Sequence, residues 1–150
     1  MNRLMIGPGQ FRRDGWMRLD VNPRYEPDFI SSIPPLPPAV KTIYWNEIEW
    51  IHGVTSLFPW DAEAVLREIH PILAVGGKLT LEQPDFSKAR ERVEWLFGDG
   101  SFKNPWHMNR FAYTVETLTA LLYKCGFSRF DVLPAQHHLP ERDFRVEAYA

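Results

Sequence analysis

Short apolar runs recur along the chain, and a residue that favours turns follows each of them. The first run stops at Gly7-Pro8-Gly9, and a short apolar or β-branched run that ends at Gly, Pro, Asn or Asp is typical of a buried strand. The runs that predict strands are Arg3–Ile6, Trp16–Val21, Val40–Trp45, Leu79–Gln83, Phe130–Leu133 and Phe144–Tyr149.

Three longer stretches place apolar residues three or four positions apart, which is the spacing of a helix that buries one face. The first runs from Asp61 to about His70, and the second from Ser87 through Phe97. The third begins after Thr114, a favourable N-cap, and ends at Gly126. The prolines of segment 31–38 exclude a helix interior or a central strand, so we expect an extended connector there.

The order of these elements predicts an α/β fold. Strands that alternate with helices form a mostly parallel sheet covered on both faces, whereas the last two strands have no helix between them and at least one should be antiparallel. Only nine residues separate Ile6 from Trp16, fewer than the ~10–12 of a complete crossover, so the first crossover helix should be missing or shortened to a turn. Because no repeat or domain boundary is visible, we expect a single domain over residues 1–150.

Four clusters that follow predicted strands should meet at one edge of the sheet, where open α/β sheets bind ligands. The glycines of the first cluster let a ligand approach the backbone, because no Cβ stands in the way. Asp20 is placed to accept hydrogen bonds from the hydroxyls of a ribose, but an Asp before Asn22-Pro23 is also an ordinary turn residue. The four clusters are Gly7–Gly9, Asp20, Asn46-Glu47 and Gln83–Asp85.

Several segments, taken in order, carry a family resemblance. They are Leu4–Gly9, Asp14-Gly15-Trp16, Leu19–Pro23, Leu66–Leu73, Gly76–Leu79, Pro84-Asp85-Phe86, Phe111–Thr114, Leu118–Leu122 and Gly126-Phe127. This order resembles a compact, methyltransferase-type-11-like branch of the class I S-adenosylmethionine-dependent methyltransferases. The resemblance covers nearly the whole chain and implies a three-layer Rossmann-like fold with S-adenosylmethionine as cofactor. It implies that Gly7, Pro8 and Gly9 contact the methionine end, Asp20 the ribose, and Asn46 with Glu47 the far side of the sulfonium.

The chain departs from this family at three places. Residues 31–38 replace the acidic residue and the Leu-Pro that help to hold the adenine. Asn46–His52 stands where the family often has Ser-His-Val-Leu-Glu-His, and Val75 replaces the proline before Gly76-Gly77. Catalysis in this family often consists of bringing two reactants together and excluding water, so no invariant base is required.

The five histidines are candidates for catalysis or metal binding. His107 lies beside Arg110 in a segment expected above the carboxyl ends of the strands, and it is our candidate general base or substrate contact. His52 is interpreted either as a contact in the binding site or as a partner in a local structural hydrogen bond, and the sequence favours neither. His70 is expected to be structural at a helix end, and His137-His138 to be exposed. Because no two histidines have the helical spacing of a metal site, we expect no bound metal.

Composition and charge narrow the classes of partner. With 45% hydrophobic and 24% charged residues the chain is typical of a globular domain, and a net charge of -2 argues against a nucleic-acid partner. No stretch approaches the ~20 apolar residues of a membrane span, and the chain opens without a signal-peptide core, so we expect a cytoplasmic protein without a membrane partner. The single cysteine, Cys125, excludes an intrachain disulfide and is expected to be a buried, inert thiol.

Methyl transfer from S-adenosylmethionine to a small-molecule or macromolecular acceptor is the function that these patterns favour. The alternative is a methyltransferase fold that no longer catalyses and serves as a binding or assembly module. Six tryptophans and thirteen prolines could supply an interface for it, including one between copies of the chain. A nucleotide-dependent oxidoreductase is a third reading, but the third glycine of the dinucleotide fingerprint is missing.

Overall fold

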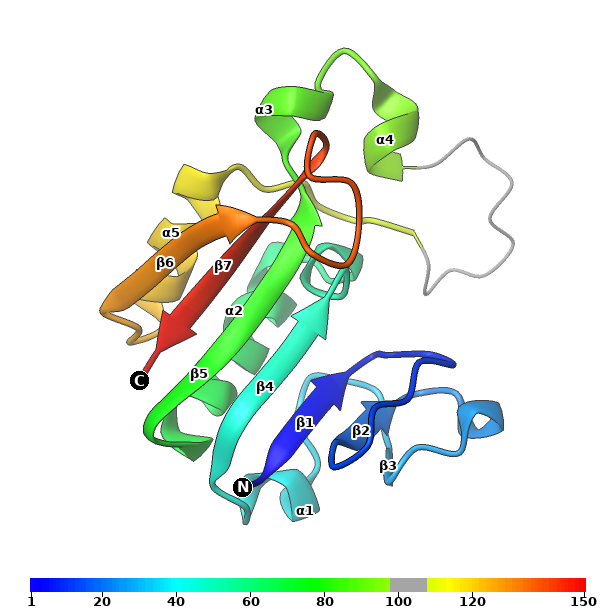
Figure 1. The fold of residues 1–150 in the computed structure, drawn as a ribbon, viewed down its shortest axis with the longest axis vertical. Helices are drawn as coiled ribbons and strands as arrows, with labels where there is room; N and C mark the ends of the chain where they lie inside the picture. The colour runs from blue at the N-terminus through cyan, green and yellow to red at the C-terminus, as the bar shows by residue number, and fades with distance from the viewer. Residues whose placement is uncertain (98–107) are drawn as a thin grey trace.

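The computed structural model describes residues 1–97 and 108–150 and contains a seven-stranded sheet of order β3-β2-β1-β4-β5-β7-β6 (Figure 1). The strands are β1 (Arg3–Ile6), β2 (Met17–Asp20), β3 (Phe29–Ile30), β4 (Trp45–Ile51), β5 (Leu73–Pro84), β6 (Arg129–Pro134) and β7 (Asp143–Tyr149). The helices are α1 (Pro38–Lys41), α2 (Pro59–Ile69), α3 (Phe86–Ala89), α4 (Val93–Phe97) and α5 (Val115–Lys124), with 3-10 turns η1 (Pro23–Tyr25), η2 (Val54–Ser56) and η3 (His70–Ile72).

Most neighbouring strands run parallel, and β7 is antiparallel to both β5 and β6. The predicted fold class is therefore confirmed, including the antiparallel strand at the C-terminus. The shortened first crossover is confirmed as well, because residues 7–16, all described, contain turns and no helix.

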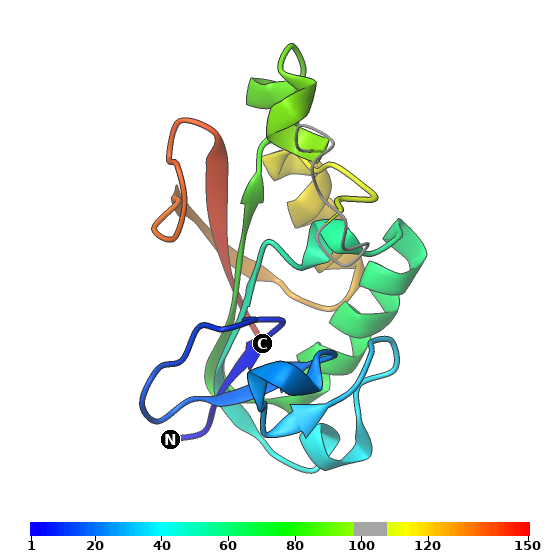
Figure 2. The same cartoon turned by 90° about the vertical axis from the view of Figure 1, so that its right-hand side faces the viewer.

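One face of the sheet packs against helices. In α2, Ala62, Val65, Leu66 and Ile69 are buried at helical spacing, so one stripe of the helix faces the sheet. Figure 2 shows α1, α2 and α5 on this side. The largest fully buried side chains of the core are Trp45, Trp50, Phe127, Leu4, Leu19, Leu36, Ile48, Leu66, Ile69, Leu79, Leu81 and Leu118.

The opposite face of the sheet carries charged side chains in ion pairs. Along β5, Leu79 and Leu81 are fully buried in the core, while Lys78, Thr80 and Glu82 alternate with them and point to the other face. Glu147 of β7 receives hydrogen bonds of 3.0 Å from Lys78 and Arg145. In Figure 2 the β1–β2 and β6–β7 connections lie on this side. Neither connection contains a helix, so the expected helical cover is present, among the described residues, on one face of the sheet only.

Two predicted elements were placed wrongly. The strand predicted over Val40–Trp45 is instead helix α1 followed by a turn, and β4 begins at Trp45. The helix starts at Pro38 because proline has a backbone angle suited to a first helical turn. Asn46 and Glu47 were predicted to follow the end of this strand, but both lie inside β4, with Glu47 on the charged face.

The second correction concerns the single helix predicted over Ser87–Phe97. The chain forms two short helices there, α3 and α4. Asp85 caps α3, because its side chain accepts a hydrogen bond of 2.9 Å from the backbone N–H of Ser87.

Candidate functional site

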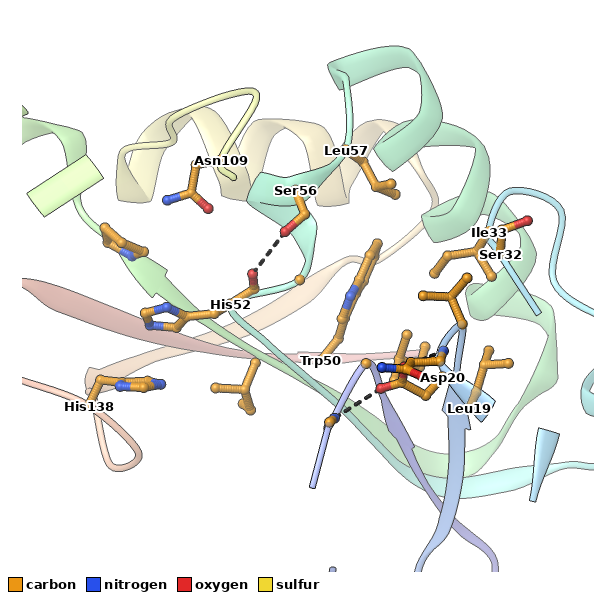
Figure 3. A pocket seen from close by; sticks show the side chains of 18 of the residues that line it. Leu19, Asp20, Ser32, Ile33, Trp50, His52, Ser56, Leu57, Asn109 and His138 are labelled. Atoms are coloured by element: carbon orange, nitrogen blue, oxygen red, sulfur yellow. Dashed lines mark hydrogen bonds between the residues drawn. The ribbon is translucent and has the colours of Figure 1, made fainter. Parts of the chain in front are cut away.

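A cavity of about 840 Å³ lies at the carboxyl ends of β1, β2, β4 and β5. Its walls come from the loops that follow these strands and β3, from α4, from Asn109 and from the β6–β7 connection. Figure 3 shows Asp20 at one end of the cavity, His52 and His138 at the other, and Trp50 between them. The volume is in the range of small-molecule and cofactor sites.

The loop after β1 is folded around the carboxylate of Asp20. Gly7 and Gly9 adopt φ angles of +62° and +58°, which side-chain-bearing residues rarely adopt. The N–H of Gly9 donates to Oδ2 of Asp20 at 2.9 Å, and the N–H of Asn22 donates to Oδ1 at 2.9 Å. Each carboxylate oxygen can accept a second hydrogen bond, so Asp20 fixes two loops and retains capacity for a ligand.

The structure brings three of the six predicted cofactor residues to the cavity. Gly7, Gly9 and Asp20 line it, whereas Pro8 lines a smaller neighbouring cavity of about 410 Å³. Asn46 and Glu47 lie at the amino end of β4, away from both cavities, because that strand begins at Trp45. They bind the N-terminal segment instead: Asn46 Oδ1 accepts from the N–H of Asn2 at 2.8 Å, and Arg3 pairs with Glu47 at 3.0 Å.

Trp50 and Gly53 form the middle of the cavity wall. Trp50 is 2% exposed and belongs to the core as well as to the cavity. The indole stands so close to Gly53 that a Cβ at position 53 would lie 1.9 Å from its Nε1. Sequence reasoning missed this contact, because a lone glycine outside a turn motif gives no local signal.

Thr55, which follows β4, forms hydrogen bonds with the segment that begins after the undescribed residues and holds this segment beside the cavity. Its hydroxyl donates to Asn109 Oδ1 at 2.6 Å, and its carbonyl accepts the N–H of Arg110 at 2.7 Å. Asn109 lines the cavity together with Trp95 and Phe97 of the preceding segment. The chain therefore reaches the cavity on both sides of the undescribed residues, and His107, the predicted base, lies outside the described residues.

At the far end of the cavity, His52 and Asp143 form a hydrogen-bonded pair. Nε2 of His52 lies 2.5 Å from Oδ2 of Asp143, and Arg142 binds the same carboxylate through Nε and Nη2. Burial alone would raise the pKa of Asp143, but the hydrogen bonds from His52 and Arg142 outweigh it and the pKa is lowered. His52 has a φ of 55°, an uncommon backbone conformation for a side-chain-bearing residue, found often at functional sites.

The ring of His138 lies against that of His52, with 3.9 Å between the centroids. Burial lowers the pKa of His138, and the neighbouring His52 lowers it further, so the neutral imidazole is favoured. The backbone around His138 is fixed by the buried Glu82, which accepts the N–H groups of Gln136, His137 and His138 at 2.8–3.0 Å. His70 packs its ring edge against Phe127, in agreement with a structural role.

Comparisons with known proteins identify the fold. No protein-family model matches the chain, and a search of curated proteins gives no match. Among solved structures, S-adenosylmethionine-dependent methyltransferases from Thermotoga maritima, Clostridium acetobutylicum and Archaeoglobus fulgidus superpose with TM-scores of 0.67, 0.69 and 0.68 at 16%, 11% and 14% identity. The superpositions cover 98–99% of this chain and 81–85% of those chains. The fold is that of the class I S-adenosylmethionine-dependent methyltransferases.

In this methyltransferase fold, the cavity lies where open α/β sheets bind ligands, beyond the carboxyl ends of the parallel strands. The sheet order is β3-β2-β1-β4-β5-β7-β6, and a loop connects β1 to β2 where a complete crossover would have a helix. None of the helices in residues 1–97 and 108–150 has the length and apolar composition needed to cross a bilayer.

Proposed function

We propose that the chain binds S-adenosylmethionine and transfers its methyl group to an acceptor that enters the far end of the cavity. The observation that carries this proposal is the convergence of Gly7, Gly9 and Asp20 on one end of a cavity in a methyltransferase fold. The backbone of the glycine loop would hold the methionine end of the cofactor. The carboxylate of Asp20 would accept hydrogen bonds from the ribose hydroxyls.

The protein's contribution to the reaction is positioning and exclusion of water. S-adenosylmethionine supplies a methyl group on a positively charged sulfur, and its transfer to a nucleophile leaves a neutral thioether. Trp50 and Leu57 line the middle of the cavity and give that part of the wall an apolar surface, which disfavours water around the reacting atoms. Asp20 orients the cofactor. It also accepts the hydrogen bond from the N–H of Gly9, which holds the glycine loop in the conformation that contacts the cofactor.

Calorimetric titration with S-adenosylhomocysteine, the demethylated cofactor, tests this proposal without a known acceptor. At about 100 times its Kd the ligand should stabilise the folded protein by roughly 2.7 kcal/mol. Asp20→Asn should weaken binding by at least about tenfold, because a hydrogen bond to a charged group contributes ~1.5–3 kcal/mol. Asp14→Asn is the matched control, because Asp14 is an exposed acid in the β1–β2 connection and does not line the cavity.

Wild-type protein that neither binds the ligand nor gains thermal stability from it would refute the cofactor assignment. The non-catalytic module would then be the better account. One observation favours that alternative independently: Phe58 and Trp60 stack at 4.9 Å on the surface, with 44% and 66% of their areas exposed. Exposed aromatic pairs are common in protein interfaces.

A further inference from the structure

We propose that His52, His138 and Asp143 form a binding site for a divalent first-row transition metal ion at the end of the cavity opposite Asp20. Each of the three offers one ligand atom, and these atoms lie within 4.8 Å of one another. Two imidazoles and one carboxylate are a donor set that suits zinc and its transition-metal neighbours. Three protein ligands leave further coordination positions open.

The three side chains come from separate parts of the chain. His52 follows β4, His138 belongs to the β6–β7 connection, and Asp143 opens β7. Each is held in place: Asp143 is 1% exposed, the N–H of His52 donates to the carbonyl of Glu82 at 2.7 Å, and the carboxylate of Glu82 binds the backbone of His138. Glu82, itself fully buried, thus joins the two histidine-bearing segments from the middle of the sheet.

Side-chain rotations that move the ligand atoms by about 1 Å would bring the cluster to metal-binding distances. At the tetrahedral angle that zinc prefers, two ligands at about 2.1 Å from one ion lie ~3.4 Å apart. Nε2 of His52 and Oδ2 of Asp143, now 2.5 Å apart, must therefore open by roughly 0.9 Å, and a pair at the 4.8 Å limit of the cluster must close by roughly 1.4 Å. The metal would replace the proton that these two atoms share.

Arg142 is the competitor of the metal in this arrangement. Its guanidinium now supplies the positive charge next to the buried carboxylate of Asp143. The side chain of Arg142 is 20% exposed and can turn toward solvent when a metal ion takes over that role. If the two histidines alone bound the metal, Arg142 would not affect the affinity. A substitution of Arg142 therefore distinguishes a site that includes Asp143 from binding by two histidines.

The location of the site suggests its use. His52, His138 and Arg142 all line the cavity, so the open metal positions would face the space beyond Trp50. An acceptor with an oxygen or nitrogen nucleophile could bind the ion there and be activated by it. This use rests on the proposed methyl transfer, whereas metal binding does not.

Titration of Zn²⁺ by calorimetry and of Co²⁺ by visible absorption tests the site in protein without a histidine tag. We expect one ion per chain, and binding weakened by at least about tenfold in His52→Ala, His138→Ala and Asp143→Asn. His137→Ala is the matched control, because this exposed neighbour is absent from the cluster. Arg142→Gln should strengthen binding.

Histidine-ring NMR of the wild-type protein gives a second readout that does not depend on variant stability. Zn²⁺ should shift the ring signals of His52 and His138 and leave those of His70 and His137 in place. Absence of binding, or binding that the three ligand variants do not weaken, would overturn the proposal. The titration needs neither cofactor nor acceptor, so its failure is distinguishable from failure to bind S-adenosylhomocysteine.

Discussion

Substitution of Gly53 by alanine tests how tightly the cavity wall is packed. Gly53 has a φ of -95°, so alanine meets no backbone strain there. Its Cβ, however, would lie 1.9 Å from Nε1 and 2.3 Å from Cδ1 of Trp50, far inside van der Waals contact. Because Trp50 is 2% exposed, the indole can move only by disturbing the core or by entering the cavity.

Overpacking of this kind costs about 1–3 kcal/mol. For a domain of this size, that loss lowers the melting temperature by roughly 2–12 °C. The assay is thermal unfolding of Gly53→Ala, Trp50→Phe and the double variant, followed by circular dichroism. Phenylalanine lacks the second ring of the indole, so its smaller side chain can move away from the new Cβ into the space that the indole leaves. The double variant should therefore be less destabilised than the sum of the two single variants. A Gly53→Ala protein that melts at the wild-type temperature, or strictly additive effects, would refute the packing described for this wall.

Three further predictions concern the rest of the fold. Burial raises the pKa of the Cys125 thiol. A thiol reagent at about pH 8 should therefore modify Cys125 much more slowly in the native protein than in denaturant. Equal rates would contradict its burial. Burial alone would raise the pKa of Glu147, but hydrogen bonds from Lys78 and Arg145 outweigh it and the pKa lies below its ordinary value of 4.5. This group therefore contributes stability that is present at neutral pH and lost as pH falls through the folded-state pKa. In urea unfolding, the stability difference between wild type and Glu147→Gln should shrink from neutral pH to about pH 3, and a constant difference would count against the ion pairs. Leu81→Ala removes a fully buried side chain from β5 and should lower the free energy of unfolding by about 2–5 kcal/mol in the same assay, whereas a loss below about 1 kcal/mol would place Leu81 outside the core.

The sequence predicted the sheet and the glycine end of the site because these depend on local patterns. The apolar run before Gly7 and the capped, amphipathic helix after Thr114 are signals carried by neighbouring residues. The short spacing between Ile6 and Trp16 correctly predicted a first crossover without a full helix. Asp20 could be placed at the cavity because it ends a strand next to that loop.

The wrong predictions concern residues whose interaction partners lie on another strand or segment of the fold. Asn46 and Glu47 were interpreted as following a strand end, yet both lie inside β4. Glu47 and Glu49 alternate there with Ile48 and Trp50 because one face of the strand is charged. The ion partners of Glu47 and Glu49 are Arg3 and Arg13, which stand 44 and 36 residues earlier in the chain and leave no local signal.

The histidine cluster was missed for the same reason. Helical spacing between histidines reveals only metal sites whose ligands share one helix. His52 and Asp143 lie 91 residues apart and meet only after β4, β5 and β7 are aligned. The left-handed backbone at His52 also has no sequence signature, because it is imposed by the turn that follows β4.

The most direct test of the central claim is an amide NMR titration of the uniformly ¹⁵N-labelled protein with S-adenosylhomocysteine. We expect a saturable response that is largest at Gly7, Gly9 and Asp20 and extends to Trp50 and Gly53 in the cavity wall. No response at millimolar ligand, or one confined to residues outside the cavity such as Phe58 and Trp60, would contradict a cofactor site at the carboxyl ends of the strands.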